Sequence, residues 1–110
     1  MESSRKVTVI ELNDRPEYQR LLEGQPQTCG MRSGRVFLSA GQACGWHSTK
    51  NCEELLVFLK GQGELQTSQD KAFAVGAGKT VYIPPETLHD VMNSGTEPLV
   101  YIYCVAPAGD

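Results

Sequence analysis

From Met31 onward, short apolar runs alternate with turn residues, and this pattern limits the possible fold classes more than any other feature of the sequence. Gly, Pro and Asn punctuate the runs about every eight to twelve residues, as expected for strands joined by turns. Because no helical periodicity separates the runs, an antiparallel sandwich or barrel is predicted. The expected strands are residues 35–40, 44–49, 53–61, 63–68, 72–75, 80–84, 89–95 and 99–106.

The N-terminal segment predicts one further strand and the one helix expected in the chain. Residues 5–12, RKVTVIEL, alternate and are rich in β-branched side chains, which favours an opening strand. Helix signals follow: Asp14 is a suitable N-cap, Pro16 lies in the first turn, and Gly24 ends the segment. A short N-terminal helix is therefore expected within residues 13–24.

One predicted strand, residues 54–60, is apolar on both faces. Side chains alternate along a strand, so one face carries Glu54, Leu56 and Phe58, and the other carries Leu55, Val57 and Leu59. A strand that is apolar on both sides in so small a β-protein needs a second layer over its outer face. A homodimer is the expected source of that layer, with the N-terminal segment as the alternative.

Composition narrows the class of protein and of partner. A chain of 110 residues is the length of a single domain, expected to span residues 1–110. The net charge of −3 and the scattered basic residues argue against nucleic acid as the main partner. No segment is long and apolar enough for a membrane span, and the N-terminal residues lack the apolar core of a signal peptide. A cytoplasmic location is therefore expected.

The four cysteines are predicted to be free thiols, because they show no CxxC spacing and no secretory context. They are Cys29, Cys44, Cys52 and Cys104. A zinc knuckle built from Cys44, His47 and Cys52 would lack a fourth ligand nearby.

Two stretches, residues 41–61 and 78–93, carry polar residues at specific spacings. The first places His47, Thr49 and Glu54 between Gly41 and Gly61. The second places Pro84, Glu86, His89 and Asn93 after Gly78. In this order and at these spacings, the two stretches closely resemble the two sequence motifs of the cupin family. The resemblance implies a small jelly-roll (double-stranded β-helix) barrel with the motif residues on inward-facing positions.

The spacing also gives a physical reason for a metal site. His47 and residue 49 are two positions apart, so their side chains leave the same face of a strand, and Glu54 follows after a short turn. A closed barrel is needed to bring His89 to them from a distant strand. Two imidazoles and one carboxylate suit a divalent transition metal: Fe, Mn, Ni or Zn. These three residues are the predicted metal ligands, although each histidine alone also fits an ordinary hydrogen-bonded role.

The chain departs from the cupin motifs at two positions. Thr49 stands where the family has its second histidine, and a neutral hydroxyl is a poor ligand beside imidazole. The candidates for a fourth ligand are Thr49 itself and Cys52, which has the strand parity of Glu54. Glu86 replaces a glycine of the second motif. We expect the local turn to change there, so that Glu86 avoids a left-handed backbone and its carboxylate lies at the barrel mouth.

Some neighbours of the motif residues are predicted to lie away from the interior. Trp46 and Glu53 are expected to face outward by strand parity. In the last strand, Tyr101 and Tyr103 share one face, and the pattern leaves open whether that face is the inner one.

The predicted function is that of a metal-dependent enzyme acting on a small polar metabolite. Cupins of this size include dioxygenases, isomerases and lyases, so the resemblance does not choose a reaction or catalytic residues. The alternative is a non-enzymatic barrel that binds or senses a small molecule with a degenerate or absent metal site, which Thr49 favours. The predicted partners are a small-molecule ligand and a second copy of the chain.

Overall fold

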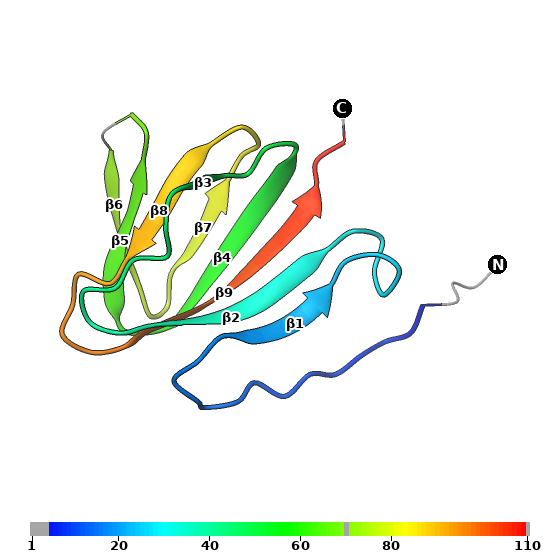
Figure 1. Cartoon of the computed structure of the whole chain (residues 1–110), viewed down its shortest axis with the longest axis horizontal. Helices are drawn as coiled ribbons and strands as arrows, with labels where there is room; N and C mark the ends of the chain where they lie inside the picture. Colours follow the sequence, from blue (N-terminus) through cyan, green and yellow to red (C-terminus); the bar gives the residue numbers. More distant parts are fainter. Residues whose placement is uncertain (1–4, 70, 110) are drawn as a thin grey trace.

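The computed structural model describes residues 5–69 and 71–109, which form two antiparallel sheets facing each other (Figure 1). One sheet has the strand order β1-β2-β9-β4-β7, and the other has the order β3-β8-β5-β6. The strands are β1 (Gln19–Glu23), β2 (Arg32–Leu38), β3 (His47–Ser48), β4 (Cys52–Lys60), β5 (Gln62–Thr67), β6 (Ala72–Gly76), β7 (Thr80–Ile83), β8 (Leu88–Met92) and β9 (Leu99–Pro107). The predicted all-β fold is confirmed. No helix in the described ranges is long and apolar enough to cross a bilayer.

Every strand predicted after Met31 is present, with differences at the ends. The largest difference is in residues 44–49, of which only His47–Ser48 form a strand. Gly45 interrupts the ladder because its φ is +111° and its N–H donates to the Asp90 carboxylate at 2.8 Å. The interruption lets the Gly45 carbonyl accept a hydrogen bond from the His47 ring.

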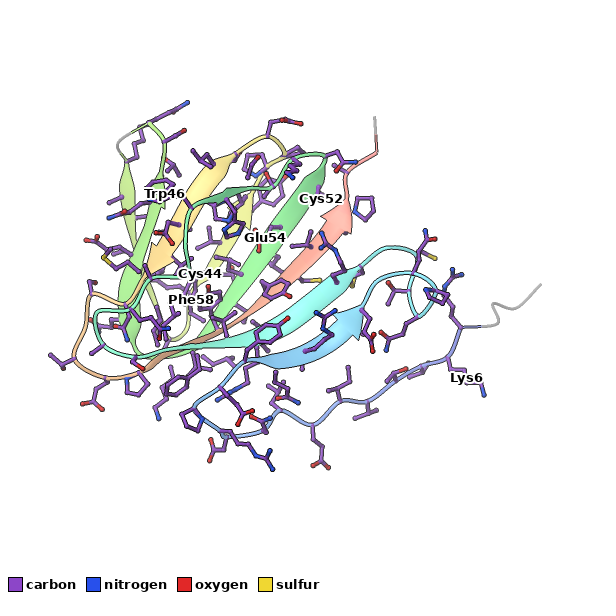
Figure 2. All side chains as sticks on the ribbon, viewed as in Figure 1. Lys6, Cys44, Trp46, Cys52, Glu54 and Phe58 are labelled. Atoms are coloured by element: carbon purple, nitrogen blue, oxygen red, sulfur yellow. The ribbon has the colours of Figure 1, made fainter. Side chains whose placement is uncertain are left out.

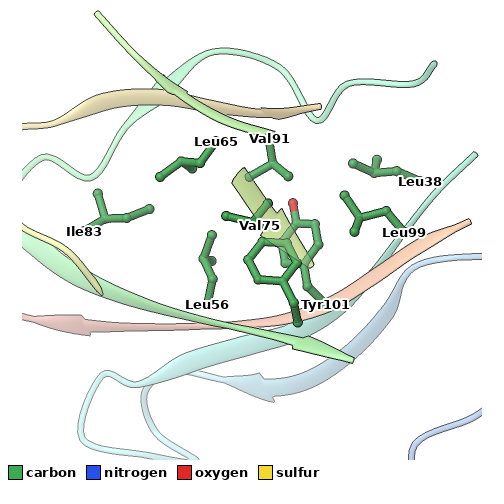
Figure 3. Close-up of a cluster of buried hydrophobic side chains, with 9 residues drawn as sticks. Leu38, Leu56, Leu65, Val75, Ile83, Val91, Leu99 and Tyr101 are labelled. Atoms are coloured by element: carbon green, nitrogen blue, oxygen red, sulfur yellow. The ribbon is translucent and has the colours of Figure 1, made fainter. Parts of the chain in front are cut away.

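The hydrophobic core lies between the sheets, where the inward faces meet (Figure 3). Its buried members are Leu38, Leu56, Phe58, Leu65, Val75, Ile83, Val91, Leu99 and Tyr101. On β4, Glu54, Leu56 and Phe58 are buried, as predicted for one shared face. On the opposite face, Leu55 and Leu59 are each 44% exposed. The outer face of β4 is therefore left partly uncovered within one chain.

The pairing register of β2, β9 and β4 arranges the inward face of the larger sheet in rows. One row is Arg32, Val105 and Glu54; the next is Gly34, Tyr103 and Leu56; the third is Val36, Tyr101 and Phe58. Tyr101 and Tyr103 thus both face the interior, which answers the question that their alternation left open.

The predicted N-terminal helix is wrong: residues 19–23 form β1, which pairs with β2. An isolated helix of this length is only marginally stable in water, so tertiary contacts determine whether the segment is helical or extended. Arg35 is buried, and its guanidinium donates to the carbonyl oxygens of Arg15 and Glu17 at 3.0 and 3.4 Å. A buried cation needs such acceptors. A helix would engage those carbonyls in its own ladder, whereas the extended chain offers them to Arg35.

The predicted opening strand is also wrong. Residues 5–12 form an arm (blue in Figure 1) that makes no ladder with any described strand. Val7 and Val9 on this arm are 99% and 89% exposed. The Gln19 side chain holds the inner end of the arm, donating to the Glu11 carbonyl and accepting from the Asn13 N–H. The β-branched pattern therefore marks a segment suited to strand pairing that joins no ladder with the strands the structure describes.

Candidate metal centre

A cavity of about 480 Å³ lies between the two sheets. Apolar side chains form part of its wall: Val36, Leu56, Val91 and Val105. Glu54 and Cys52 reach it from β4, and Cys44 reaches it from the segment before β3 (Figure 2). Such a mixture of apolar wall and a few converging polar groups is typical of a small-molecule site.

The structure brings His47, Glu54 and His89 together in this cavity. One donor atom from each lies within 4.8 Å of the others, and in the described ranges this is the one such group of His, Cys, Asp or Glu. His47 and His89 are direct partners in the β3–β8 ladder, with ring centroids 4.3 Å apart. Glu54 faces them from the opposite sheet, its Oε1 atom 3.2 Å from Nε2 of His89. Strand parity alone does not bring Glu54 close to the two histidines. The two sheets do so because they face each other across one cavity.

Backbone hydrogen bonds orient both imidazoles. Nδ1 of His47 lies 2.9 Å from the Gly45 carbonyl oxygen, and Nδ1 of His89 lies 3.0 Å from the Thr87 carbonyl oxygen. A carbonyl only accepts, so each Nδ1 carries a hydrogen and donates it. Each Nε2 is thereby the atom available to a metal ion, in the arrangement that metal-ligating histidines commonly have.

The pKa of His89 is raised above its ordinary value by its surroundings. Burial alone lowers it, because the charged imidazolium is desolvated. The hydrogen bond to Glu54, the Thr87 carbonyl and the nearby carboxylates of Glu54 and Asp90 more than offset that effect. When His89 is protonated, its Nε2 hydrogen faces Glu54, so a proton and a metal ion would compete for the same nitrogen.

Asp90 is a positioning residue that the sequence interpretation missed. It is buried, and its carboxylate accepts the Gly45 N–H at 2.8 Å. Gly45 in turn offers its carbonyl to His47, so Asp90 helps to hold the residue whose carbonyl orients the imidazole. A signal was present in principle, since Asp90 directly follows a motif histidine, but its partner lies 45 residues away.

Thr49, the first candidate for a fourth ligand, is buried and bonded to the backbone. Its hydroxyl donates to the Pro84 carbonyl at 2.7 Å and accepts from the Thr87 N–H at 3.1 Å. Thr49 thereby ties the turn before β4 to the turn that leads into β8, the strand of His89. In this chain, residue 49 has a structural role that accounts for its hydroxyl.

Cys52, the second candidate, lines the cavity, and its thiol points to the Asn51 side-chain oxygen at 3.8 Å. Neither Cys52 nor Cys44 belongs to the donor group formed by the two histidines and Glu54. Cys44 instead lies beside the Tyr101 hydroxyl. The pKa of Tyr101 is raised well above its ordinary value, first by burial and then by the Cys44 thiol. The neutral phenol is thus the stable form at this wall of the cavity.

The predictions that Trp46 and Glu53 face outward are confirmed. The prediction that Glu86 avoids a left-handed backbone is wrong. Trp46 is 50% exposed and does not line the cavity, and exposed Glu53 accepts a hydrogen bond from the Tyr82 hydroxyl at 2.9 Å. Glu86 keeps the left-handed backbone, with φ 57°, instead of a changed turn. Its side chain lines a separate cavity beside β6 and β7. The N–H of Glu86 bonds the Lys50 carbonyl at 2.8 Å, which helps to hold this strained turn.

The donor set suits a divalent transition metal. Two imidazole nitrogens and one carboxylate oxygen are ligands that Fe, Mn, Ni and Zn accept, and an arrangement of three protein ligands leaves positions for water or substrate. The donors already lie close together, so they can meet at one ion with little movement.

The comparisons with known proteins agree with this fold. The chain matches the Cupin domain family over residues 34–105, which is 72 of its 110 residues. It is 39% identical over 61 residues to the uncharacterized protein MJ1618 of Methanocaldococcus jannaschii, covering 56% of this chain and 48% of that protein. It is 38% identical over 61 residues to a glucose-6-phosphate isomerase of Pyrococcus abyssi, covering 52% of this chain and 32% of that protein. The chain thus spans about half and about a third of these relatives.

A solved structure extends the likeness to nearly the whole chain. The cupin 2 conserved barrel domain protein from Salinispora arenicola CNS-205 superposes with a TM-score of 0.75 at 22% identity, covering 94% of this chain and 92% of that one. At this identity the likeness concerns the fold alone. The family match runs through both motifs and through His47, Glu54 and His89, and it shows that this chain belongs to the cupin domain family.

Proposed function

We propose that this chain is a metal-dependent enzyme acting on a small polar metabolite. His47, Glu54 and His89 would hold the divalent metal. The observation that carries the proposal is the convergence of two oriented Nε2 atoms and a buried carboxylate in one cavity. A metal ion bound there supplies Lewis acidity towards a substrate oxygen.

The chain's own residues prepare the site for such chemistry. The Gly45 and Thr87 carbonyls fix the imidazoles, and Asp90 fixes Gly45. The apolar part of the wall limits the access of water, which strengthens electrostatic interactions in the cavity. Cys52 or water is better placed than Thr49 to complete the ligand set, because the Thr49 hydroxyl would have to give up two backbone hydrogen bonds.

The relative named a glucose-6-phosphate isomerase supports isomerisation as the reaction to assay first. The aligned part is a third of that relative, so the comparison supports a reaction class rather than a substrate. The assay follows interconversion of glucose 6-phosphate and fructose 6-phosphate by protein loaded with each of the four metals. His89→Ala is the test variant and Leu88→Ala, its exposed neighbour on β8, is the control.

We expect metal-dependent turnover in the native protein and in Leu88→Ala, and its loss in His89→Ala. Turnover that survives in a folded His89→Ala protein would contradict the metal mechanism. Binding of the sugar phosphate without conversion, and equally well after chelation, would identify the non-enzymatic barrel instead.

We also propose that two copies of the chain associate through the outer face of β4. Leu55 and Leu59 of β4 and Tyr82 of β7 are exposed on that side, at 44%, 44% and 60%. Val7 and Val9 of the N-terminal arm add exposed β-branched side chains with no partner strand in the described chain. A single domain over residues 1–110 and a cytoplasmic location stay predictions.

A further inference from the structure

Arg32 lies on the same inward row as the predicted ligand Glu54. The register pairs Arg32 of β2 with Val105 of β9, and Val105 with Glu54 of β4. Since neighbouring strands are about 4.8 Å apart, the backbones of Arg32 and Glu54 are separated by roughly 10 Å across the cavity floor. The Arg32 side chain passes beside Gly24 and lines the same cavity as Glu54, so a small metabolite in that cavity can reach both residues.

The charge on the cavity wall is unbalanced in favour of cations. Arg32 and Lys50 line the cavity, and neither forms an ion pair with another described residue. Glu54 is the one carboxylate on the lining, and it is engaged by His89. With a divalent ion at the three predicted ligands, the cavity would be strongly positive and would attract an anion.

Two tyrosine hydroxyls lie in the row next to Arg32. Gly34 leaves room for the Tyr18 ring, which occupies the place of a Cβ atom, so that the Tyr18 and Tyr103 hydroxyls are 2.6 Å apart. Burial and the Tyr18 hydrogen bond raise the pKa of Tyr103, while Arg20 and Arg32 oppose them. The neutral phenol is therefore the stable form of Tyr103. One hydroxyl of the pair donates to the other, so the pair keeps one hydrogen that a ligand can accept. Together with Arg32, the two hydroxyls form a group of donors at this end of the cavity; Glu23, the β1 partner of Arg32, does not line the cavity and forms no ion pair with it in the described chain.

We propose that the substrate of this site carries an oxyanion, a carboxylate or a phosphate, which Arg32 binds with help from the Tyr18–Tyr103 pair while the rest of the molecule reaches the metal end. A guanidinium offers two parallel N–H donors to either group, and such charge-assisted contacts are stronger than neutral ones. The proposal deepens the proposed function by naming the substrate class, but binding of the anion itself does not require the metal.

The test is isothermal titration calorimetry with matched ligands. Glucose 6-phosphate and inorganic phosphate probe the phosphate, gluconate probes the carboxylate, and glucose is the neutral control. Each is titrated into native protein, Arg32→Gln and Arg20→Gln, with and without Zn²⁺. Arg20 is the matched control because it lies on adjacent β1 and affects Tyr103 electrostatically, but does not line the cavity.

We expect at least one anion to bind about tenfold or more tightly than glucose, and Arg32→Gln to weaken it about tenfold or more. Arg20→Gln should stay within about twofold of the native protein, and the bound anion identifies phosphate or carboxylate as the preferred group. Equal binding of anions and glucose, equal effects of the two substitutions, or no saturable binding of any anion would overturn the proposal. If anion binding depends on Arg32 but the native protein holds no metal, the proposed function fails and this inference stands.

Discussion

At the scale of single residues, the ion pair that His89 forms with Glu54 makes the stability of the protein depend on pH. The pKa of His89 in the folded chain is raised above the ordinary 6.5. A raised pKa contributes stability that is fully present below 6.5 and is lost as pH rises through the folded value. We expect metal-free protein to become less stable towards urea over that rise.

Urea unfolding of the metal-free protein at a series of pH values measures this dependence. Glu54→Gln is the control, because it keeps the shape of the side chain but removes the charge, and it should flatten the dependence. An equal slope in native protein and Glu54→Gln would show that the pair is not its source. Metal binding should change in the opposite sense, because protons compete with the ion for Nε2, so affinity falls as pH is lowered.

The convergence of His47, Glu54 and His89 could be predicted from the sequence, because their spacings resemble the two cupin motifs and that resemblance implies a closed barrel that brings His89 to the other two. Asp90 and Arg32 could not be predicted in the same way. Asp90 acts on Gly45 across 45 residues, and Arg32 joins the row of Glu54 only through the register of three strands. Neither contact leaves a local pattern in the chain.

At the scale of elements, the short segment before β3 determines how His47 is presented. Gly45 combines a φ of +111° with bonds to Asp90 and His47, and a side chain there would be strained although the space is open. We expect Gly45→Ala to weaken metal binding by displacing the carbonyl that orients His47. Competition with a chromophoric chelator measures the affinity.

The matched control is Gly78→Ala. Gly78 also has a positive φ, +87°, and open space where a Cβ would lie, but it belongs to the turn between β6 and β7, away from His47. The Gly78→Ala variant should be destabilised as Gly45→Ala is, but should keep the metal affinity of the native protein. Equal affinity in the two variants would mean that the Gly45 carbonyl does not position His47.

The N-terminal segment shows the limit of local patterns at this scale. The signals for a helix in residues 13–24 were sound as local signals, but a short helix contributes little stability by itself. Arg35 on β2 needs the carbonyls of Arg15 and Glu17, and that need is not visible in the segment that meets it. Tertiary contacts therefore overrode local propensity.

At the scale of the whole molecule, the uncovered outer face of β4 predicts a dimer. We expect light scattering after gel filtration to give twice the mass of one chain, and Leu55→Lys with Leu59→Lys to give a single chain, because two buried charges oppose association. Leu88→Lys is the control, since Leu88 is about equally exposed, at 43%, but lies on the other sheet. A monomeric native protein, or dissociation by Leu88→Lys alone, would contradict the assignment of this face.

The central claim, that His47, Glu54 and His89 hold a metal, is tested most directly by metal content. Inductively coupled plasma mass spectrometry on protein purified without a histidine tag, and again after loading with Fe, Mn, Ni and Zn ions, gives the ion and its stoichiometry. The His47→Ala, His89→Ala double variant is the control. We predict about one ion per chain in the native protein and none in the variant. Native protein that stays free of metal after loading, or a variant that holds as much, would contradict the account.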